Sequence, residues 1–316
     1  MKSLKYYKYR LQWHLAKWII PNKPLHLDIE LTSACNLKCI FCPQSEEKKP
    51  FTVKHMDFEL FKKIIDEAER LRIPSIKLNL RGESTLYPMF YEACQYVKGK
   101  FIDIRLNTNG NYPNNLNHFM ADTFTEISVS VDADSPVTYG RIRKGGRLAV
   151  VEDNILRLYG MMNHSKQTLR LSFVITSINR KQVDAFKEKW RNTCPEIKFF
   201  IRHAAERTKD IYPYATDTEM ATTRKDCLMP RRRMTILQDG TILGCCVAAW
   251  KERDMYRLNN LKTDCPQELL KAWNGNKANK LRARLASGDA FNHLYQCKHC
   301  FSRESFNWVS KGETHE

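Results

Sequence analysis

The chain has 316 residues, of which 42% are hydrophobic, and carries a formal net charge of +17 at pH 7. No apolar run approaches the roughly 20 residues that a bilayer-spanning helix needs, and the basic, aromatic N-terminus lacks the apolar stretch and cleavage site of a secretory signal. We therefore expect a cytoplasmic protein whose eleven cysteines serve metal or redox chemistry rather than a disulfide framework.

Residues 1–25 form a basic and aromatic segment, and from residue 26 strand-like and helix-like patterns alternate. The hydrophobic periodicity predicts strands at 26–31, 76–80, 101–107, 126–131, 169–175 and 197–202. It predicts helices at 57–72, 87–98, about 148–162 and about 180–191, the first with Asp57 as its cap. Six strands separated by helices favour parallel βα units, and hence an α/β barrel or an open sheet over residues 26–212.

Polar motifs follow four successive predicted strands. A cysteine-rich loop follows the first, "RGEST" the second and "NTNG" the third, while "SVD" ends the fourth. In parallel α/β folds the chemistry lies at the carboxyl ends of the strands. The four motifs are therefore expected to meet in one site.

Beyond residue 212 the pattern changes and predicts a second, smaller unit over 213–316. Residues 234–246 are typical of a hairpin with Asp239-Gly240 at its turn. A long helix is expected from about 266 to 287, and "CKHC" at 297–300 closes the unit.

The first cysteine loop, "ACNLKCIFCP", holds three thiols, at Cys35, Cys39 and Cys42. Thiolates ligate iron–sulfur clusters or zinc. Three ligands around a four-iron cluster leave one iron open to bind another molecule, whereas zinc would normally gather a fourth ligand at short spacing, and only His55 is near. The spacing favours a cluster; zinc and inert thiols stay as alternatives.

The pattern Cys35-x3-Cys39-x-Phe41-Cys42 resembles the signature of radical S-adenosylmethionine (SAM) enzymes. The resemblance implies a partial (β/α)6 TIM-like barrel with a 4Fe-4S cluster whose open iron chelates SAM. It also implies reductive cleavage of SAM to a 5′-deoxyadenosyl radical, which abstracts hydrogen from a substrate. In such enzymes the protein orients the cofactors that carry the chemistry.

The same resemblance implies the SAM contacts. Gly82-Glu83 matches the motif that receives the SAM amino group, although Ser84 stands where the family has proline. The other implied contacts are Phe41 against the adenine, Ser130 and Asp132 near the ribose, and Asn107 and Asn109 near the cluster and the methionine moiety. Ordinary alternatives are a solvated carboxylate for Glu83, a helix cap for Ser130 and Asp132, and a turn for the two asparagines.

The later cysteines resemble a shortened SPASM-type extension, which makes the second unit a small iron–sulfur domain of hairpin plus helix. The resemblance implies one auxiliary 4Fe-4S cluster, with zinc as the alternative, and its ligands would be Cys227, Cys245, Cys297 and Cys300. Cys246 adjoins a predicted ligand and would donate hydrogen to a substrate radical in an epimerising relative. The alternative is that it merely packs or takes the place of Cys245 as a ligand. Cys94 is expected to pack as a small hydrophobe, and Cys194 and Cys265 receive no role.

Three functions remain open. The favoured one is a radical SAM enzyme acting on a small polar molecule, such as a sugar, an aminocyclitol or a nucleotide-linked compound, by epimerisation, oxidation or dehydration. The alternatives are a peptide-modifying enzyme and, less favoured, a non-enzymatic iron–sulfur electron carrier. The short segment ahead of the first strand and the truncated extension favour the small molecule.

The net positive charge suits an anionic substrate or an acidic electron donor such as flavodoxin or ferredoxin, and it also suits a plain basic surface. Only "PRRRM" at 230–234 is densely basic, and no recognisable nucleic-acid module accompanies it. We expect the N-terminal segment, with Trp13, Trp18 and Ile19, to pack on the barrel as a helix rather than to anchor at a membrane surface.

Overall fold

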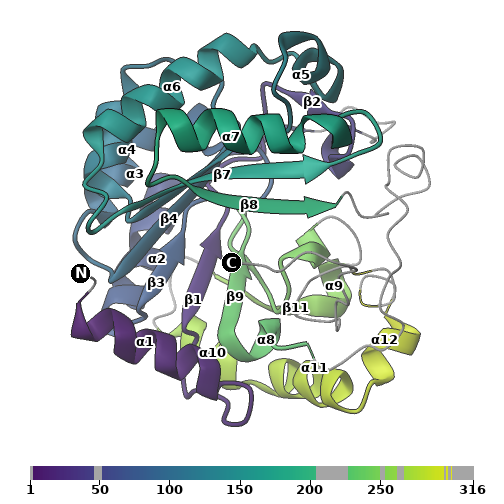
Figure 1. Ribbon diagram of the computed structural model, residues 1–316. Coiled ribbons are helices and arrows are strands. Elements are labelled where there is room, and N and C mark those ends of the chain that lie inside the picture. Colours follow the sequence, from purple (N-terminus) through teal and green to yellow (C-terminus); the bar gives the residue numbers. More distant parts are fainter. Residues whose placement is uncertain are drawn as a thin grey trace.

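The computed structural model describes residues 3–45, 52–203, 227–249, 253–261 and 267–294, together with Cys297 and Cys300. Its centre is a nine-stranded sheet that curves into a partial barrel (Figure 1). The strand order is β11 (Arg257–Asn260), β10 (Thr241–Leu243), β9 (Arg233–Ile236), β1 (His26–Ile29), β3 (Ser75–Lys77), β4 (Asp103–Thr108), β5 (Glu126–Ser130), β7 (Thr168–Ile175) and β8 (Lys198–His203).

Neighbouring strands from β9 to β8 pair in parallel, whereas β10 is antiparallel to both β9 and β11. A separate two-stranded ribbon pairs β2 (Lys38–Cys39), inside the first cysteine loop, with β6 (Arg143–Lys144). The predicted parallel α/β architecture is therefore confirmed.

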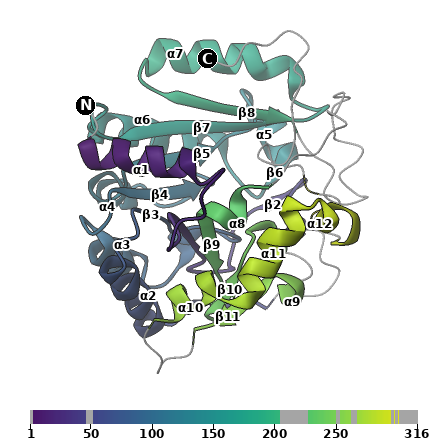
Figure 2. The same ribbon diagram turned by 90° about the horizontal axis from the view of Figure 1, so that it is seen from below.

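Helices cover the outer face of the sheet (Figures 1 and 2). These are α2 (Phe58–Arg70), α3 (Phe90–Val97), α4 (Leu116–Thr123), α6 (Leu148–Met161) and α7 (Val183–Thr193). The remaining helices are α1 (Leu4–Leu15), α5 (Pro136–Ile142), α8 (Met229–Arg232), α9 (Arg253–Tyr256), α10 (Glu268–Asn274), α11 (Asn276–Ala286) and α12 (Asp289–His293). As predicted, Asp57 caps α2, because its Oδ1 accepts a hydrogen bond from Leu60 N at 3.0 Å.

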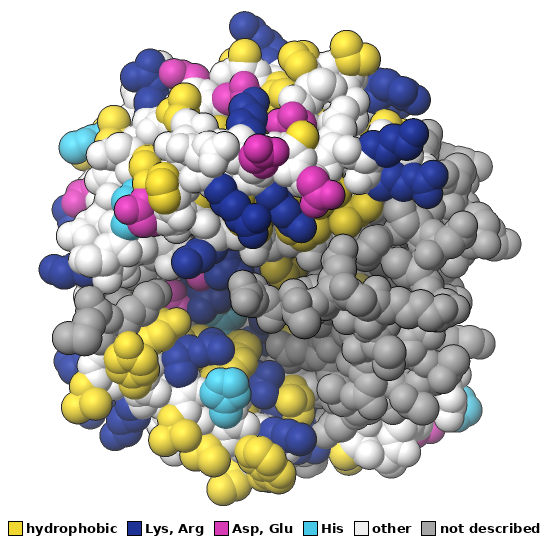
Figure 3. Space-filling model, viewed as in Figure 1, with side chains coloured by type: hydrophobic (Ala, Val, Ile, Leu, Met, Phe, Trp, Pro, Cys, Tyr) yellow, Lys and Arg dark blue, Asp and Glu magenta, His cyan; other side chains and the backbone are white. Residues whose placement is uncertain are grey.

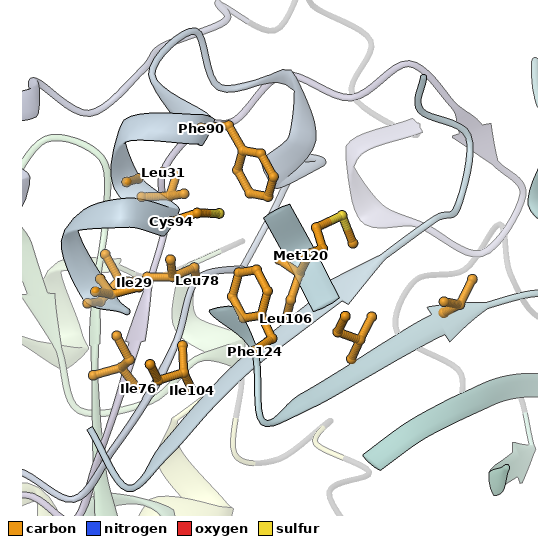
Figure 4. Packing of buried hydrophobic residues seen from close by; sticks show 14 of the residues in the cluster. Ile29, Leu31, Ile76, Leu78, Phe90, Cys94, Ile104, Leu106, Met120 and Phe124 are labelled. Atoms are coloured by element: carbon orange, nitrogen blue, oxygen red, sulfur yellow. The ribbon is translucent and has the colours of Figure 1, made fainter. Parts of the chain in front are cut away.

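Alternation along the strands separates an apolar outer face from a polar inner one. Ile76 and Leu78, Ile104 and Leu106 point outward and pack against helix residues such as Phe90 and Met120 (Figure 4). Cys94 lies fully buried in this core, as predicted. The strand residues that alternate with these outward-facing ones point into the lumen of the barrel. They are polar or charged: His26, Asp28, Ser75, Lys77, Asp103, Arg105, Glu126, Arg170 and Arg233.

The C-terminal hairpin has the predicted turn, with Gly240 at φ +79°, but it does not stand apart from the barrel. Its first strand, β9, pairs in parallel with β1 and so extends the main sheet. The boundary predicted between residues 212 and 213 falls in the segment 204–226, outside the described residues.

The single helix predicted from about 266 to 287 is wrong. Two helices, α10 and α11, occupy this region, because Gly275 between them is extended at φ −71° and ψ 162°. Lys271 O would lie only 2.8 Å from a Cβ at this position, so the tight break between the helices requires glycine.

Helix α1 closes the amino-terminal end of the barrel. Tyr9 and Ala16 are buried, and the Trp13 ring meets the His26 ring at a centroid distance of 6.4 Å. The predicted packing is confirmed for Trp13 but wrong for Trp18 and Ile19, which are each 68% exposed. None of the helices in the described ranges combines the length and apolar character needed to cross a membrane.

Candidate functional site

The first cysteine loop is held in place by hydrogen bonds of both its side chains and its backbone. Ser33 Oγ accepts from Lys54 N at 2.9 Å, and Cys42 N donates to Cys39 O at 3.0 Å. Strand β2 fixes Cys39 against β6. Cys39 is buried, and Cys35 and Cys42 are half-buried, so the three thiols share one sheltered but reachable loop.

The three thiols are close enough to influence one another. The pKa of Cys35 is raised to about 11, mainly by burial and also by the charges of Glu83, Cys39 and Cys42, against a backbone hydrogen bond from Leu37. Soft metal centres bind the thiolate form and release its proton. Among the described residues, no three His, Cys, Asp or Glu side chains are arranged around a single metal ion, but three mutually coupled thiols are a donor set that fits an iron–sulfur cluster.

Gly82 brings the "RGEST" loop into contact with the cysteine loop. Its φ is +62°, and a Cβ there would lie 2.5 Å from Thr32 O and 2.6 Å from Ala34 O. The next amide, Glu83 N, donates to Ala34 O at 2.6 Å. Only glycine permits this approach.

Glu83 is a buried carboxylate, 2% exposed. It accepts hydrogen bonds from Asn109 N at 2.7 Å, Thr108 Oγ1 at 2.8 Å and Thr85 Oγ1 at 3.0 Å. These contacts with described residues are all to neutral groups, and burial raises the pKa of Glu83 against them. A buried carboxylate without a basic partner fits the ammonium group of a ligand.

The "NTNG" motif contributes one of its two predicted residues to this cluster. Asn109 Nδ2 lies 4.0 Å from Cys35 Sγ and donates to Asn36 Oδ1 at 2.8 Å. Asn107 instead is exposed on the lumen face of β4, and its place near the cluster and the methionine moiety stays a prediction. Ser84 is buried, and its hydroxyl donates to Leu78 O at 2.5 Å. This hydrogen bond stabilises the turn between residues 78 and 84.

At the end of β5, Ser130 is half-buried and Asp132 fully buried. Asp132 has a left-handed φ of +62°, which is strained for a non-glycine residue. Its Oδ2 accepts from Arg143 Nε at 2.7 Å, and its Oδ1 from Val174 N at 2.6 Å. Both carboxylate oxygens are thus engaged inside the protein, and the ribose contact of Asp132 stays a prediction.

Arg143 is the site residue that sequence reasoning missed. It pairs with Asp132, its Nη1 lies 3.7 Å from Cys39 Sγ, and its guanidinium carbon is 5.7 Å from the centroid of the Phe41 ring. It therefore joins the cysteine loop to the β5 motif. Its position in "RIRKGG" gives no spacing signal, because the contact arises only when β6 pairs with β2.

The second cysteine set gathers where the hairpin meets the last helices. Cys227 and Cys297 lie in a small apolar cluster with Cys245 and Cys246 packed against it. A hydrogen bond between the adjacent thiols raises the pKa of Cys245 and lowers that of Cys246 to about 7. The charges of Cys300 and Cys227 also raise the pKa of Cys245. Cys245 thus lies near two other predicted ligands, Cys227 and Cys300, and thiols are a donor type that fits an iron–sulfur cluster. The assignment of the four ligands stays a prediction. Tyr256 Oη lies 3.1 Å from Cys297 Sγ.

The lumen of the barrel presents more basic than acidic groups. Asp28 is fully buried, with Lys77 Nζ at 2.7 Å and Arg233 Nη1 at 3.2 Å. Arg105 and Arg170 approach Glu126 in the same way, and Arg105 also pairs with Asp103. The cationic side chains are 17–31% exposed and the carboxylates at most 15%. Figure 3 shows charged side chains deep in the hollow of this face.

Two family models match the chain. The Radical SAM superfamily model matches residues 29–188, just over half of the chain. The SPASM model, an iron-sulfur cluster-binding domain, matches residues 227–301. Together they cover both cysteine sets.

Among curated proteins, the chain is similar to the mycofactocin maturase MftC of Mycobacterium tuberculosis. The two are 28% identical over 165 residues, which are 52% of this chain and 41% of the relative. The chain therefore matches less than half of the length of this relative.

Two solved structures are similar in fold. Streptococcus suis SuiB bound to precursor peptide SuiA has a TM-score of 0.65 at 14% identity, covering 88% of this chain and 70% of that chain. BtrN in complex with AdoMet and 2-DOIA has a TM-score of 0.57 at 15% identity, covering 89% and 94%. Likeness at such identity concerns the fold of the barrel and its extension.

Proposed function

This chain belongs to the radical SAM superfamily and carries a SPASM-type domain, and from that membership we propose that it is an enzyme that modifies a peptide. The two domains imply a SAM-binding 4Fe-4S cluster, an auxiliary cluster and SAM as cofactors. When bound, these cofactors supply a 5′-deoxyadenosyl radical through reductive cleavage of SAM. The residues of this chain bind and orient them.

We assign the SAM-binding cluster to Cys35, Cys39 and Cys42, and the auxiliary cluster to Cys227, Cys245, Cys297 and Cys300. The buried carboxylate of Glu83, held by neutral donors, is proposed to receive the SAM amino group. Gly82, Ser84, Asn109 and Ser130 would line the same pocket, and Phe41 would pack on the adenine. Arg143 would hold Asp132 and the loop of Cys39 in place.

Peptide modification is favoured over a small molecule by the similarity of this chain to two proteins whose names point to peptides. One curated relative is a maturase, 28% identical over 165 residues, and SuiB, whose structure is bound to precursor peptide SuiA, is similar in fold over 88% of this chain. The argument for a small molecule from the segment ahead of the first strand and from the cysteine pattern of the extension is weaker than this similarity.

The lumen supports an acidic group on the substrate. Arg170 Nε is buried and without a hydrogen-bond partner among the described residues, and so is Thr235 Oγ1, on a fully buried side chain. With the surplus of basic groups around them, they suit a carboxylate or a phosphate. The same groups keep an anionic small molecule as the second candidate, in line with the similarity to BtrN in complex with 2-DOIA.

Cys246 is the proposed hydrogen donor in the epimerising variant of this reaction. It lies beside Cys245 and within electrostatic reach of Asp28, Arg233 and Lys77, and hence next to the lumen. Its S–H would pass a hydrogen atom to the substrate radical and yield an isomer. The thiyl radical left on Cys246 would return to the thiol with one electron from the reductase and one proton from solvent. In the oxidising variant the auxiliary cluster, when bound, would supply an acceptor for one electron of the substrate radical, and a proton would leave to solvent. We further propose a cytoplasmic location and an acidic reductase such as flavodoxin or ferredoxin.

The test is an anaerobic incubation of reconstituted enzyme with SAM and dithionite in deuterated water. Short peptides encoded beside the gene and a panel of sugar phosphates and nucleotides are supplied in separate reactions, and products are analysed by mass spectrometry. We expect a peptide that either loses two hydrogens or gains one solvent deuterium. In the second case, Cys246→Ala should still form 5′-deoxyadenosine but yield no deuterated isomer.

Cys194→Ala, at a buried cysteine on the outer side of the barrel, is the matched control and should behave as wild type. Conversion of a small molecule with every peptide unchanged would overturn the peptide proposal in favour of the second candidate.

A further inference from the structure

Helix α1 carries an apolar stripe on the face that points away from the barrel. Leu4, Tyr7, Leu11 and Leu15 are 86%, 57%, 59% and 42% exposed, and Trp18 in the following turn is 68% exposed. These positions are three or four residues apart, so at about 100° per residue they fall within an arc of about 80°. Ile19 and Ile20, also exposed, extend the stripe beyond the helix.

The helix cannot rotate to bury this stripe, because its opposite face is already packed. Tyr9 is 2% and Ala16 0% exposed. The Trp13 ring lies between the His26 ring and the guanidinium groups of Arg232 and Arg233, at 5.1 and 5.7 Å. The stripe therefore stays on the surface of the folded chain.

Basic residues flank the stripe on both sides. Lys5 and Lys8 lie along one edge, and Arg10 and Lys17 along the other. Residues 1–25 contain no Asp or Glu, and Lys277 and Lys280 of α11 are also exposed at the lower end of the molecule. Figure 3 shows hydrophobic side chains interleaved with Lys and Arg over the position of α1, at the lower left.

We propose that α1 docks this protein onto a membrane surface rich in anionic phospholipid, with the helix parallel to the bilayer. An exposed apolar stripe with basic edges and interfacial aromatic residues, here Tyr7 and Trp18, is the pattern of a helix that lies in the headgroup region. The basic edges would meet lipid phosphates while the stripe enters the acyl boundary. A second copy of this chain is a poorer occupant, because it would bring the same uncompensated cations face to face.

This proposal does not rest on the proposed reaction. The apolar stripe and the Lys residues are independent of both cysteine sets, so membrane binding and SAM cleavage can fail separately. If both hold, the enzyme works on substrates delivered at the membrane surface.

The test is co-sedimentation of the full-length protein with vesicles. Vesicles of phosphatidylcholine alone are compared with vesicles that contain phosphatidylglycerol, at low and high salt. Wild type should bind only the anionic vesicles and release at high salt. Leu11→Asn should weaken binding by about tenfold, and Lys8→Glu by at least about fivefold.

Matched controls come from other exposed positions. Leu156→Asn on α6, 46% exposed, and Lys166→Glu in the following loop should bind as wild type does. Thermal unfolding of all variants checks that they fold, and because the altered side chains are exposed, the melting temperatures should agree. The proposal is overturned if wild type ignores anionic vesicles or if the α1 variants bind as well as the controls. Self-association that Leu11→Asn abolishes, without vesicle binding, would assign the stripe to a second copy instead.

Discussion

Burial shifts the pKa values of two ionisable side chains of the barrel in opposite directions, that of Glu83 upward and that of His26 downward. Glu83 is a carboxylate among neutral donors, and burial raises its pKa. His26 accepts from or donates to Ser75 Oγ at 2.7 Å, and burial lowers its pKa to about 4 despite the nearby Asp28. Glu83 thus favours a cationic ligand, while His26 stays neutral at neutral pH.

The pKa of His26 predicts an acid-sensitive component of stability. Since the pKa falls from 6.5 in the unfolded chain to about 4 in the folded one, the unfolded chain binds the extra proton between these values. Stability is therefore lost as the pH falls through this window. Wild type should lose about 2 kcal/mol more than His26→Gln between pH 7.5 and pH 5, measured as the free energy of unfolding in urea. Equal losses in the two proteins would show that His26 does not titrate in this way.

Which site residues the sequence could predict depends on whether their role is local. Cys35, Cys39, Cys42 and the Gly82-Glu83 pair lie in short motifs, so spacing is informative. Arg143 acts through a contact with Cys39 that spans 104 positions, and a single sequence carries no signal for such a pairing. For the same reason, the sequence could not predict that the carboxylate of Asp132 accepts hydrogen bonds from Arg143 and Val174.

At the level of elements, the candidate site depends on how closely two loops approach. Gly82 lets the turn after β3 contact the backbone of the cysteine loop at Thr32 and Ala34. The loop is also tied by β2 to β6, so the thiols are held from both sides. Movement of this turn would displace Glu83 and the thiols together.

Gly82→Ala should therefore destabilise the protein and impair cluster binding. The left-handed φ costs any Ala about 1 kcal/mol, and the Cβ at 2.5 Å from Thr32 O adds a clash with backbone. Gly99→Ala is the matched control, since Gly99 has φ +75° but nothing within 4 Å of its Cβ. We expect Gly82→Ala to lose at least about 2 kcal/mol more than the control in urea unfolding, and to bind less iron. Similar values for the two variants would contradict the close approach.

The order of the strands and helices along the chain can be predicted from the sequence. Which strands pair in the sheet can be predicted only in part. Alternating patterns gave the six barrel strands to within a few residues, because their outward sides are apolar. The parallel pairing of β9 with β1 joins residues more than 200 positions apart, so the hairpin looked like a separate unit. The helix break at Gly275 was missed because one glycine in a helical pattern is compatible with a continuous helix.

At the scale of the whole molecule, the buried ion pair of Arg81 with Glu30 lies in the barrel, and Arg81 also hydrogen-bonds to the C-terminal unit. Arg81 donates to both carboxylate oxygens of Glu30 at 2.6 Å, and also to Gln238 Oε1 at 3.1 Å and Ala249 O at 3.3 Å. Breaking such a pair leaves an uncompensated buried charge. With the continuous sheet, it holds the first cysteine set and the C-terminal one in one frame around the lumen.

The most direct test of the central claim, that this chain is a radical SAM enzyme, is the formation of 5′-deoxyadenosine. Reconstituted wild type is incubated anaerobically with SAM and dithionite, beside Cys39→Ala and the core variant Cys94→Ala. Because Cys39 is a proposed cluster ligand and Cys94 only packs in the core, wild type and Cys94→Ala should form 5′-deoxyadenosine and Cys39→Ala should form none. No 5′-deoxyadenosine from wild type, or equal amounts from Cys39→Ala, would contradict it.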